Sequence, residues 1–367
     1  MTCFHPIPAF YPAYTNNDGK RYLQFGRRRY EIGLVSRHWV WLFEEFQQEY
    51  PAGINCYDAP YDYPLYFDKD GEINGFNIKV PCGKCIGCRL DYSRMWATRS
   101  VNEAEISGYN NCSFVTLTFN NDMLLRRSNP WSLNKTAFRS WVKRLRKAIK
   151  LKYNKEIRIM ACGEYGAKHL RPHYHMLIYG FNFPDKYVYK YRKLGNNDVF
   201  YYRSDFLEDV WRPAHSSDSF GFSVIGNVNF ESSAYVARYV TKKLFGPVAE
   251  KVYKHKEPEF LTTSRNPGLG YGYLERYYKD IINNGYITLP NFHKVPIPRY
   301  YINKVQEIDF EIYNKYRIDL FNKKIDNLFI KDVNSTQERL IVREELKKMQ
   351  LDRLYRKYEF DDCEYGI

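Results

Sequence analysis

The sequence of 367 residues lacks the features of a membrane or secreted protein. No apolar run approaches a membrane-spanning helix, which needs about 20 residues, and residues 1–6 lack the basic stretch and apolar run of a leader peptide. There is also no internal repeat and no long low-complexity segment. We therefore expect a cytosolic globular protein, either one large domain with appendages or two modest domains.

Cysteine is scarce, with 8 residues in the chain. That number is too small for a disulfide scaffold, and in a reducing compartment it indicates thiols or metal ligands. Three of the residues form a C-x-x-C-x-x-C motif at Cys82, Cys85 and Cys88. Gly83 and Gly87 permit the tight turns of a metal knuckle, so we favour structural Zn²⁺ over free thiols. The fourth ligand stays open between Cys3, His5 and Cys56, while Cys112, Cys162 and Cys363 are interpreted as ordinary residues.

Negative charge is under-represented, and the formal net charge is +14. Residues 79–158 hold 17 Lys and Arg against 5 Asp and Glu, so most of the excess lies in one block. A solubility surface would alternate its signs, whereas a lopsided block repels itself unless phosphates neutralise it. The charge distribution thus favours a nucleic-acid partner.

Regular elements are predicted mainly in the middle of the chain. Residues 1–95 are rich in Tyr, Pro and Gly and predict an irregular segment, with residues 96–250 as the core, 251–305 as an accessory segment and 306–367 as a charged helical tail. Strands are predicted at residues 114–119, 157–162, 173–179, 200–202 and 220–228. One helix is expected where Phe138, Trp141, Val142, Leu145 and Ile149 recur, and another after Ser232 as its cap, running through Leu244. The fold class is therefore α+β.

Two histidines alternate in an apolar strand. His173 and His175 stand at positions i and i+2, so both imidazoles project from the same face of a sheet. They form a pair of metal ligands, although two structural histidines would show the same spacing.

Two tyrosines are spaced for one face of a helix. Tyr235 and Tyr239 stand at i and i+4, and Lys242 and Lys243 follow one turn later. Packing of two aromatic rings into a core gives the same pattern. We favour chemistry because a phosphodiester site needs these parts: a divalent cation to neutralise its oxygens, a phenolate nucleophile and a cation such as Lys242 to steady charge.

The third metal ligand is sought among the carboxylates. Glu164 lies at the end of the strand predicted beside the histidines, although a carboxylate in a turn facing water explains it equally well. Asp122 and Glu231 are the substitutes.

These motifs resemble those of a known family. The segment from Arg171 to His175 resembles the histidine-hydrophobe-histidine motif of HUH endonucleases. Residues 235–243 are similar to the paired-tyrosine motif of the replication initiators of small icosahedral single-stranded DNA phages, and residues 114–122 to their first motif. Further likeness to the gokushovirus branch of the microviruses lies at residues 82–85, 264–270 and 296–300, so the resemblance spans roughly residues 80–300.

The resemblance implies a five-stranded antiparallel sheet flanked by helices, with the tyrosine helix over the histidines. It implies Mg²⁺ or Mn²⁺, a nick in single-stranded or supercoiled phage origin DNA, a 5′-phosphotyrosine and later religation, which together start and end rolling-circle replication. It also implies host partners such as a helicase and a polymerase, no membrane, and the cytoplasm of the infected bacterium as the location.

DNA contacts are expected from the basic helix, where Lys143, Arg144, Arg146, Lys147 and Lys150 would form a cationic surface around Trp141. Further candidates are Arg126, Arg127 and Arg171. Two other functions fit the same residues: a transposase or relaxase with these motifs, and a non-catalytic nucleic-acid-binding protein with structural zinc.

Overall fold

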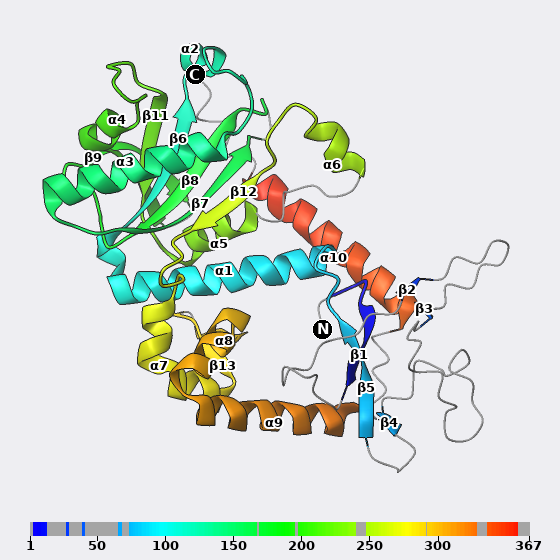
Figure 1. Ribbon diagram of the computed structural model, residues 1–367. Helices are drawn as coiled ribbons and strands as arrows, with labels where there is room; N and C mark the ends of the chain where they lie inside the picture. Colours follow the sequence, from blue (N-terminus) through cyan, green and yellow to red (C-terminus); the bar gives the residue numbers. More distant parts are fainter. Residues whose placement is uncertain are drawn as a thin grey trace. The chain divides into compact units, whose positions relative to one another are not determined.

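The computed structural model describes residues 3–12, 27–28, 39–40, 65–67, 73–166, 169–194, 197–239, 247–290, 292–328 and 336–358 (Figure 1). The chain divides into two compact units. The first combines Met1–Cys88 with Asp319–Lys348, and the second combines Arg89–Ile318 with Met349–Ile367.

The first unit contains regular structure that the sequence did not reveal. Strands β1 (Ile7–Pro12), β5 (Ile73–Val80) and β4 (Leu65–Phe67) form an antiparallel sheet in the order β1-β5-β4. Strands β2 (Arg27–Arg28) and β3 (Trp39–Val40) form a second pair. The prediction of an irregular segment is wrong for these residues. The strands β2, β3 and β4 are only two or three residues long, too short to show a periodic pattern, and β1 pairs with the distant β5.

The second unit is built on an antiparallel sheet in the order β12-β7-β8-β6-β11-β10-β9. The predicted strands are present as β6 (Cys112–Phe119), β7 (Arg158–Tyr165), β8 (Pro172–Tyr179), β10 (Asn197–Arg203) and β11 (Gly221–Gly226). Two more, β9 (Tyr187–Leu194) and β12 (Phe260–Thr263), form its edges. The expected number of five is therefore corrected to seven. Edge strands are half-exposed, so they lack the apolar alternation that marks inner strands.

Helix α3 (Lys135–Tyr153) covers one face of this sheet. It begins where the Asn134 side chain accepts a hydrogen bond from the Ala137 N–H. The predicted apolar positions Phe138, Trp141, Val142, Leu145 and Ile149 are all buried, and they pack in one core with the sheet residues Val115 and Leu117. The helix prediction is confirmed.

Helices α1 (Ile86–Ser107) and α5 (Phe230–Arg238) pack against the other face. Their core includes Met160 and Cys162 of β7, which alternate with residues of the α3 face, and Val236 of α5. The α5 cap is Asn229 and not Ser232 as predicted. Ser232 is the third helical residue, where its N–H donates to Asn229 Oδ1 and its Oγ accepts from the Asn229 N–H.

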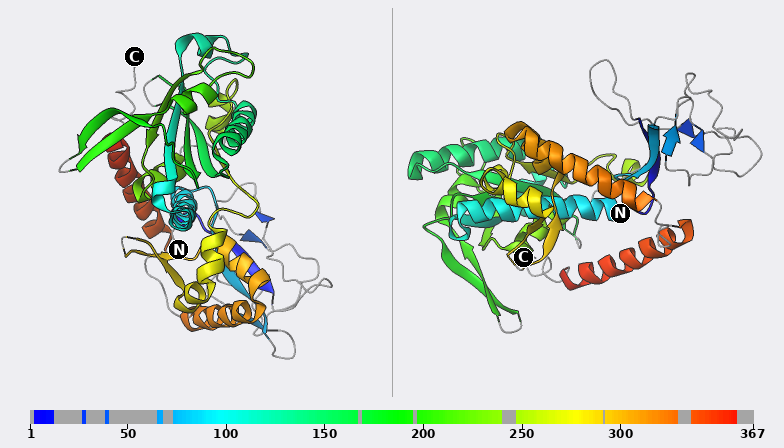
Figure 2. Two further views of the ribbon diagram at one scale, coloured as in Figure 1. Left: turned by 90° about the vertical axis from the view of Figure 1, so that its left-hand side faces the viewer. Right: turned by 90° about the horizontal axis from the view of Figure 1, so that it is seen from below.

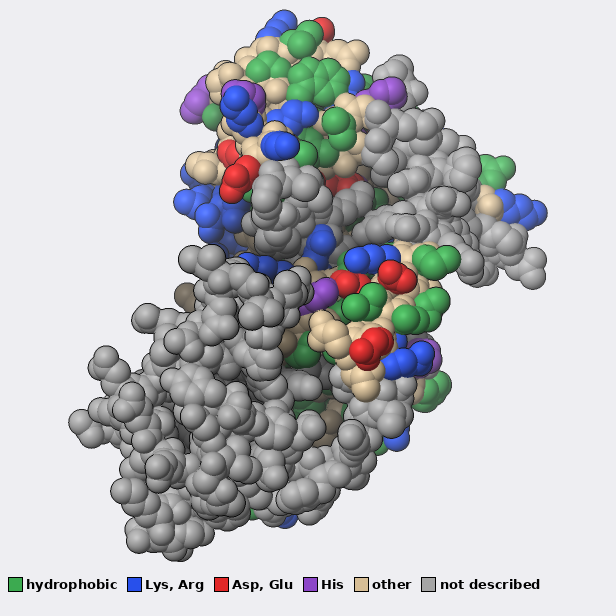
Figure 3. Space-filling model, turned by 90° about the vertical axis from the view of Figure 1, so that its right-hand side faces the viewer, with side chains coloured by type: hydrophobic (Ala, Val, Ile, Leu, Met, Phe, Trp, Pro, Cys, Tyr) green, Lys and Arg blue, Asp and Glu red, His purple; other side chains and the backbone are tan. Residues whose placement is uncertain are grey.

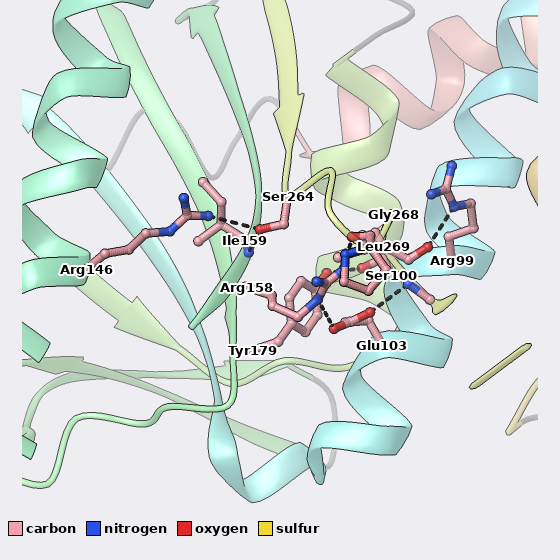
Figure 4. Close-up of polar contacts among 12 residues, drawn as sticks. Arg99, Ser100, Glu103, Arg146, Arg158, Ile159, Tyr179, Ser264, Gly268 and Leu269 are labelled. Atoms are coloured by element: carbon pink, nitrogen blue, oxygen red, sulfur yellow. Dashed lines mark hydrogen bonds and ion pairs between the residues drawn. The ribbon is translucent and has the colours of Figure 1, made fainter. Parts of the chain in front are cut away.

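The segment 264–270 joins α1 to the edge of the sheet (Figure 4). The Glu103 carboxylate of α1 accepts from the Arg158 guanidinium at 2.5 Å and from the Gly270 N–H at 2.6 Å. Arg99 donates to the Leu269 carbonyl at 2.9 Å. Gly270 has a φ of 78°, and a Cβ there would lie 2.1 Å from the Tyr301 hydroxyl oxygen, so only glycine fits.

The remaining described helices and strands surround these layers. In the second unit they are η2 (Tyr109–Asn111), α2 (Asn121–Leu125), α4 (Asp205–Val210), α6 (Pro247–Val252), α7 (Tyr271–Asn284), β13 (Tyr286–Thr288), β14 (Lys294–Pro296) and α8 (Arg299–Ile308). The predicted helical tail is present as α9 (Phe310–Leu328) and α10 (Gln337–Tyr358), whose residues are shared between the two units. Among the described residues, no helix has both the length and the apolar character to cross a membrane.

Candidate active site

The two histidines project from the centre of the large sheet. His173 and His175 lie on β8, opposite Thr118 and Thr116 of β6. Residues that face each other across an antiparallel pair share one side of the sheet, which here is the side covered by α5. The predicted alternation of the two imidazoles is confirmed.

Each imidazole is held by a threonine hydroxyl. Thr118 Oγ1 lies 2.9 Å from His173 Nδ1, and Thr116 Oγ1 lies 3.1 Å from His175 Nδ1. These contacts fix the ring orientations and leave Nε2 as the nitrogen that points to other partners. A Cβ at Gly166 would come within 3.0 Å of His173 Nε2, so glycine preserves space at that atom.

Glu164 places a carboxylate beside His175. It lies on β7 opposite His173, is fully buried, and places Oε1 2.7 Å from His175 Nε2. The alternative of a water-facing turn carboxylate is wrong, because β7 continues through Tyr165. Asp122 and Glu231 lie in the first turns of α2 and α5.

Both predicted tyrosines contact His175. The ring centroids of Tyr235 and His175 are 5.3 Å apart in an edge arrangement, whereas the Tyr239 ring is stacked on His175 at 5.1 Å with 1° between the planes. The two phenol rings are 4.8 Å apart. Tyr239 is 4% exposed, while Tyr235 is partly buried. Lys242 lies outside the described residues, so its role stays a prediction.

Sequence reasoning missed the residues of β6 that support this cluster. Besides the two threonines, Phe114 is stacked on His175 at 6.0 Å between ring centroids and meets Tyr235 edge-on at 6.0 Å. The sequence could have predicted these residues, because every second residue of the predicted strand 114–119 lies on the same face of the sheet.

The sequence over these elements matches a known family. The family model for replication-associated proteins of the ORF2 type matches residues 112–244, which begin with β6 and include β8 and α5. Replication-associated protein VP4 of Bdellovibrio phage phiMH2K is 34% identical over 229 residues, covering 61% of this chain and 67% of the phage protein. Replication-associated protein ORF2 of Spiroplasma virus 4 is 31% identical over 259 residues, covering 68% of this chain and 73% of that protein. The chain belongs to the family of phage replication-associated proteins.

A third relative, Replication-associated protein ORF4 of Chlamydia phage 1, is 31% identical over 266 residues, covering 70% of this chain and 63% of the phage protein. No solved structure matches the chain. The family assignment confirms the resemblance to phage replication proteins, and it gives this chain a role in phage DNA replication.

Three arginines expected to bind DNA lie near the ends of the site strands in this replication-associated protein. Arg171 donates to the Phe119 carbonyl at 2.7 Å and to Asn121 Oδ1 at 2.5 Å, so it joins the start of β8 to the end of β6. Arg126 is exposed and pairs with Asp218 at 3.3 Å. Arg127 lies over the Phe119 ring, 4.4 Å from its centroid. Contact of these arginines with DNA stays a prediction.

The basic helix α3 differs from its predicted arrangement. Lys143 and Lys147 are exposed, but Arg144 donates to the Arg212 carbonyl at 2.7 Å. Trp141 is 1% exposed, so its expected place at the centre of a cationic surface is wrong. Its indole N–H binds the Val210 carbonyl at 2.8 Å within the core. The exposed lysines therefore lie on the outer side of α3, and α3 itself covers the sheet face opposite the histidines.

Strands β9 and β10 carry an aromatic surface that sequence reasoning also missed. They form a two-stranded ribbon that extends beyond the rest of the sheet (Figure 2). Tyr189 is 45% and Tyr191 64% exposed, and the basic residues Lys190 and Lys193 are exposed between and beyond them. Figure 3 shows a mixture of basic, hydrophobic and acidic side chains over the described part of another face.

The predicted zinc ligands lie together in the first compact unit. The Sγ atoms of Cys3, Cys82, Cys85 and Cys88 all lie within 4.8 Å of one another. Of the other candidates, His5 pairs with Glu344 at 2.8 Å, and Cys56 lies outside the described residues. Burial raises the pKa of Cys85, but hydrogen bonds from the backbone N–H groups of Cys88 and Phe4, together with those from the Cys88 and Cys82 side chains, lower the pKa to about 7.

Proposed function

We propose that this phage replication-associated protein nicks single-stranded DNA and later rejoins it through a phosphotyrosine, and thereby starts and ends rolling-circle replication. The observation that supports this activity is the contact of His175 with Tyr235, Tyr239 and Glu164 on one sheet face. A nucleophile beside a ligand set is the arrangement that phosphodiester cleavage requires.

Three side chains at this site offer donor atoms of the kinds that bind a divalent cation. Glu164 offers a carboxylate oxygen, and His173 and His175 offer Nε2 atoms whose rings are already oriented from Nδ1. A carboxylate oxygen suits Mg²⁺ or Mn²⁺, and we assign one such cation to these three residues. When bound, it would neutralise the oxygens of the scissile phosphate.

The tyrosines supply the covalent step. A phenol that has lost its proton attacks the phosphorus, the new phosphorus–oxygen bond to tyrosine forms, and the bond to the 3′ oxygen breaks. The leaving oxygen takes up a proton and becomes a 3′-hydroxyl, while the 5′-phosphate stays on the protein. Rejoining is the reverse reaction, so the bond energy is kept in the phosphotyrosine.

The test uses single-stranded oligonucleotides that tile the replicon encoding this chain. The full chain is incubated with each one and Mn²⁺, then separated on a denaturing gel. A 3′-end label is expected to move with the protein, because the protein holds the 5′ end of the downstream fragment. A 5′-end label is expected in a shortened strand that a polymerase extends.

Matched variants separate catalysis from binding. Tyr235→Phe combined with Tyr239→Phe, and separately Glu164→Gln, should remove the adduct while DNA binding persists. Tyr92→Phe, at an exposed tyrosine of α1, is the control and should keep the adduct. Binding without an adduct on any oligonucleotide would instead support the non-catalytic nucleic-acid-binding function. A nick outside a replication origin would support a transposase or relaxase.

A further inference from the structure

The four clustered cysteines of the first unit have the spacing of metal ligands. Cys85 Sγ lies 3.8 Å from Cys3 Sγ, and Cys82 Sγ lies 4.0 Å from Cys88 Sγ. Four thiolates around Zn²⁺, each at about 2.3 Å in a tetrahedron, stand about 3.8 Å apart. The two measured sulfur separations therefore match the edges of such a tetrahedron.

The observed Sγ–Sγ separations are too long for disulfide bonds. A disulfide brings two sulfur atoms to about 2.05 Å, roughly half the observed separations. The six cysteines in the described part of the chain form no disulfide with one another. The four sulfur atoms come from two distant stretches of sequence and lie around one point. One central cation accounts for this arrangement better than two disulfide bonds do.

Backbone N–H groups point at the sulfur atoms. The Cys82 N–H donates to Cys3 Sγ at 3.2 Å, the Cys85 N–H donates to Cys82 Sγ at 3.3 Å, and the Phe4 N–H donates to Cys85 Sγ at 3.4 Å. Hydrogen bonds of this kind stabilise thiolates, the form that binds metal. Such donors are of little use to neutral thiols, which accept weakly.

The backbone conformation around the four cysteines brings their sulfur atoms together. Gly83 adopts a φ of 74°, which allows the chain to turn between Cys82 and Cys85. Cys88 lies in the first turn of α1, where the helix dipole favours negative charge. Phe4 and Leu340 pack around the sulfur atoms, so part of the cluster is closed to water.

We propose that Cys3, Cys82, Cys85 and Cys88 bind one structural Zn²⁺ with four sulfur ligands. The ion joins the beginning of the chain to the loop that leads into α1. Four protein ligands leave no open position for a substrate, so this site supports structure and not catalysis. The fourth ligand that the sequence left open is Cys3.

The experiment measures metal in the purified full chain. Elemental analysis should find one equivalent of zinc per chain, and Cys3→Ser and Cys85→Ser should each lose most of it. Cys112→Ser, at a buried cysteine of β6, is the matched control and should keep its zinc. His175→Ala should also keep it, which distinguishes this ion from one held at the candidate active site.

Cobalt substitution keeps the test decisive if the serine variants fail to fold. Replacing the bound metal of the unmodified chain with Co²⁺ should give the strong visible bands of a tetrahedral ion and near-ultraviolet thiolate charge-transfer bands. Iron in place of zinc, weak octahedral cobalt bands, or a zinc content that Cys85→Ser and Cys112→Ser leave equal would each overturn the proposal.

Discussion

The imidazole of His175 and the phenol of Tyr239 lie in parallel planes, 5.1 Å apart between ring centroids. The stack covers one side of the imidazole, and Phe114 is stacked on the same imidazole at 6.0 Å. His175 is 4% exposed as a result. The partly exposed His173 and Tyr235 therefore provide the more open side of the cluster.

This difference predicts which tyrosine attacks first. Tyr235 is partly exposed and Tyr239 is 4% exposed, so incoming DNA should reach Tyr235 with less rearrangement. We expect Tyr235→Phe to remove most of the adduct in a single-turnover reaction, and Tyr239→Phe to retain it. Quantification of the 3′-labelled adduct checks this. Equal adduct from both variants would show that the two phenols are interchangeable.

The threonines that hold the histidines should affect metal affinity. Thr116→Val and Thr118→Val keep the side-chain shape but remove the Nδ1 partner, and loss of such a partner typically weakens metal binding about 10- to 100-fold. Calorimetric titration of Mn²⁺ measures the change. Thr262→Val on β12 is the control, and the idea fails if all three variants bind alike.

The central strands and the histidine pair were predictable because their information is local. His173 and His175 show the two-residue alternation of a strand, and Tyr235 and Tyr239 the four-residue spacing of a helix. Glu164 was the preferred carboxylate, but its burial came only from the pairing of β7 with β8.

Other features depend on distant partners and could not be predicted. The strands β9 and β12 carry polar or short sequences, so their presence follows from pairing with a neighbour. The sequence predicted two incompatible positions for Trp141, one on the buried apolar face of α3 and one at its cationic surface. Only packing against the sheet decides between them.

Removal of the Glu103 carboxylate should destabilise the second unit. Glu103 binds Arg158 and the Gly270 N–H, so Glu103→Ala leaves a charge and a donor without their acceptor. We expect a loss of roughly 3 kcal/mol in the free energy of unfolding, near the lower end for a broken buried ion pair. Urea denaturation measures it. The control Glu156→Ala, whose carboxylate is exposed, should cost less than about 1 kcal/mol.

The exposed tyrosines of the β9–β10 ribbon should contribute to binding of single-stranded DNA. Exposed phenol rings provide surfaces on which bases stack, worth about 1–3 kcal/mol per base. We expect Tyr189→Ala combined with Tyr191→Ala to raise the Kd about tenfold or more. Fluorescence anisotropy at constant salt measures the Kd, with the exposed Phe310→Ala as control. An unchanged Kd would place the DNA elsewhere.

Burial of Cys112 predicts a stability change in alkali. Desolvation raises the pKa of Cys112 from 9.0 to about 11, although a backbone hydrogen bond from Gly180 opposes it. Below pH 9 the thiol is protonated in both states, and between pH 9 and 11 only the unfolded state ionises. The free energy of unfolding should therefore fall over this interval. In Cys112→Ala the fall should be smaller, as urea midpoints at pH 8 and pH 10 would show, and equal falls would contradict the argument.

The order β12-β7-β8-β6-β11 has a consequence for the tyrosines. The chain leaves β11, forms α5 and returns to the sheet as β12. The segment that carries the phenols is therefore connected at both ends to strands of the sheet, β11 on one side of the histidine strand and β12 on the other. A fragment that stops at residue 250 would lack β12 and so the second of these connections. In the nicking reaction that we propose, a DNA end attached to this segment would therefore stay above the strand that bears the imidazoles, while the 3′ end is released.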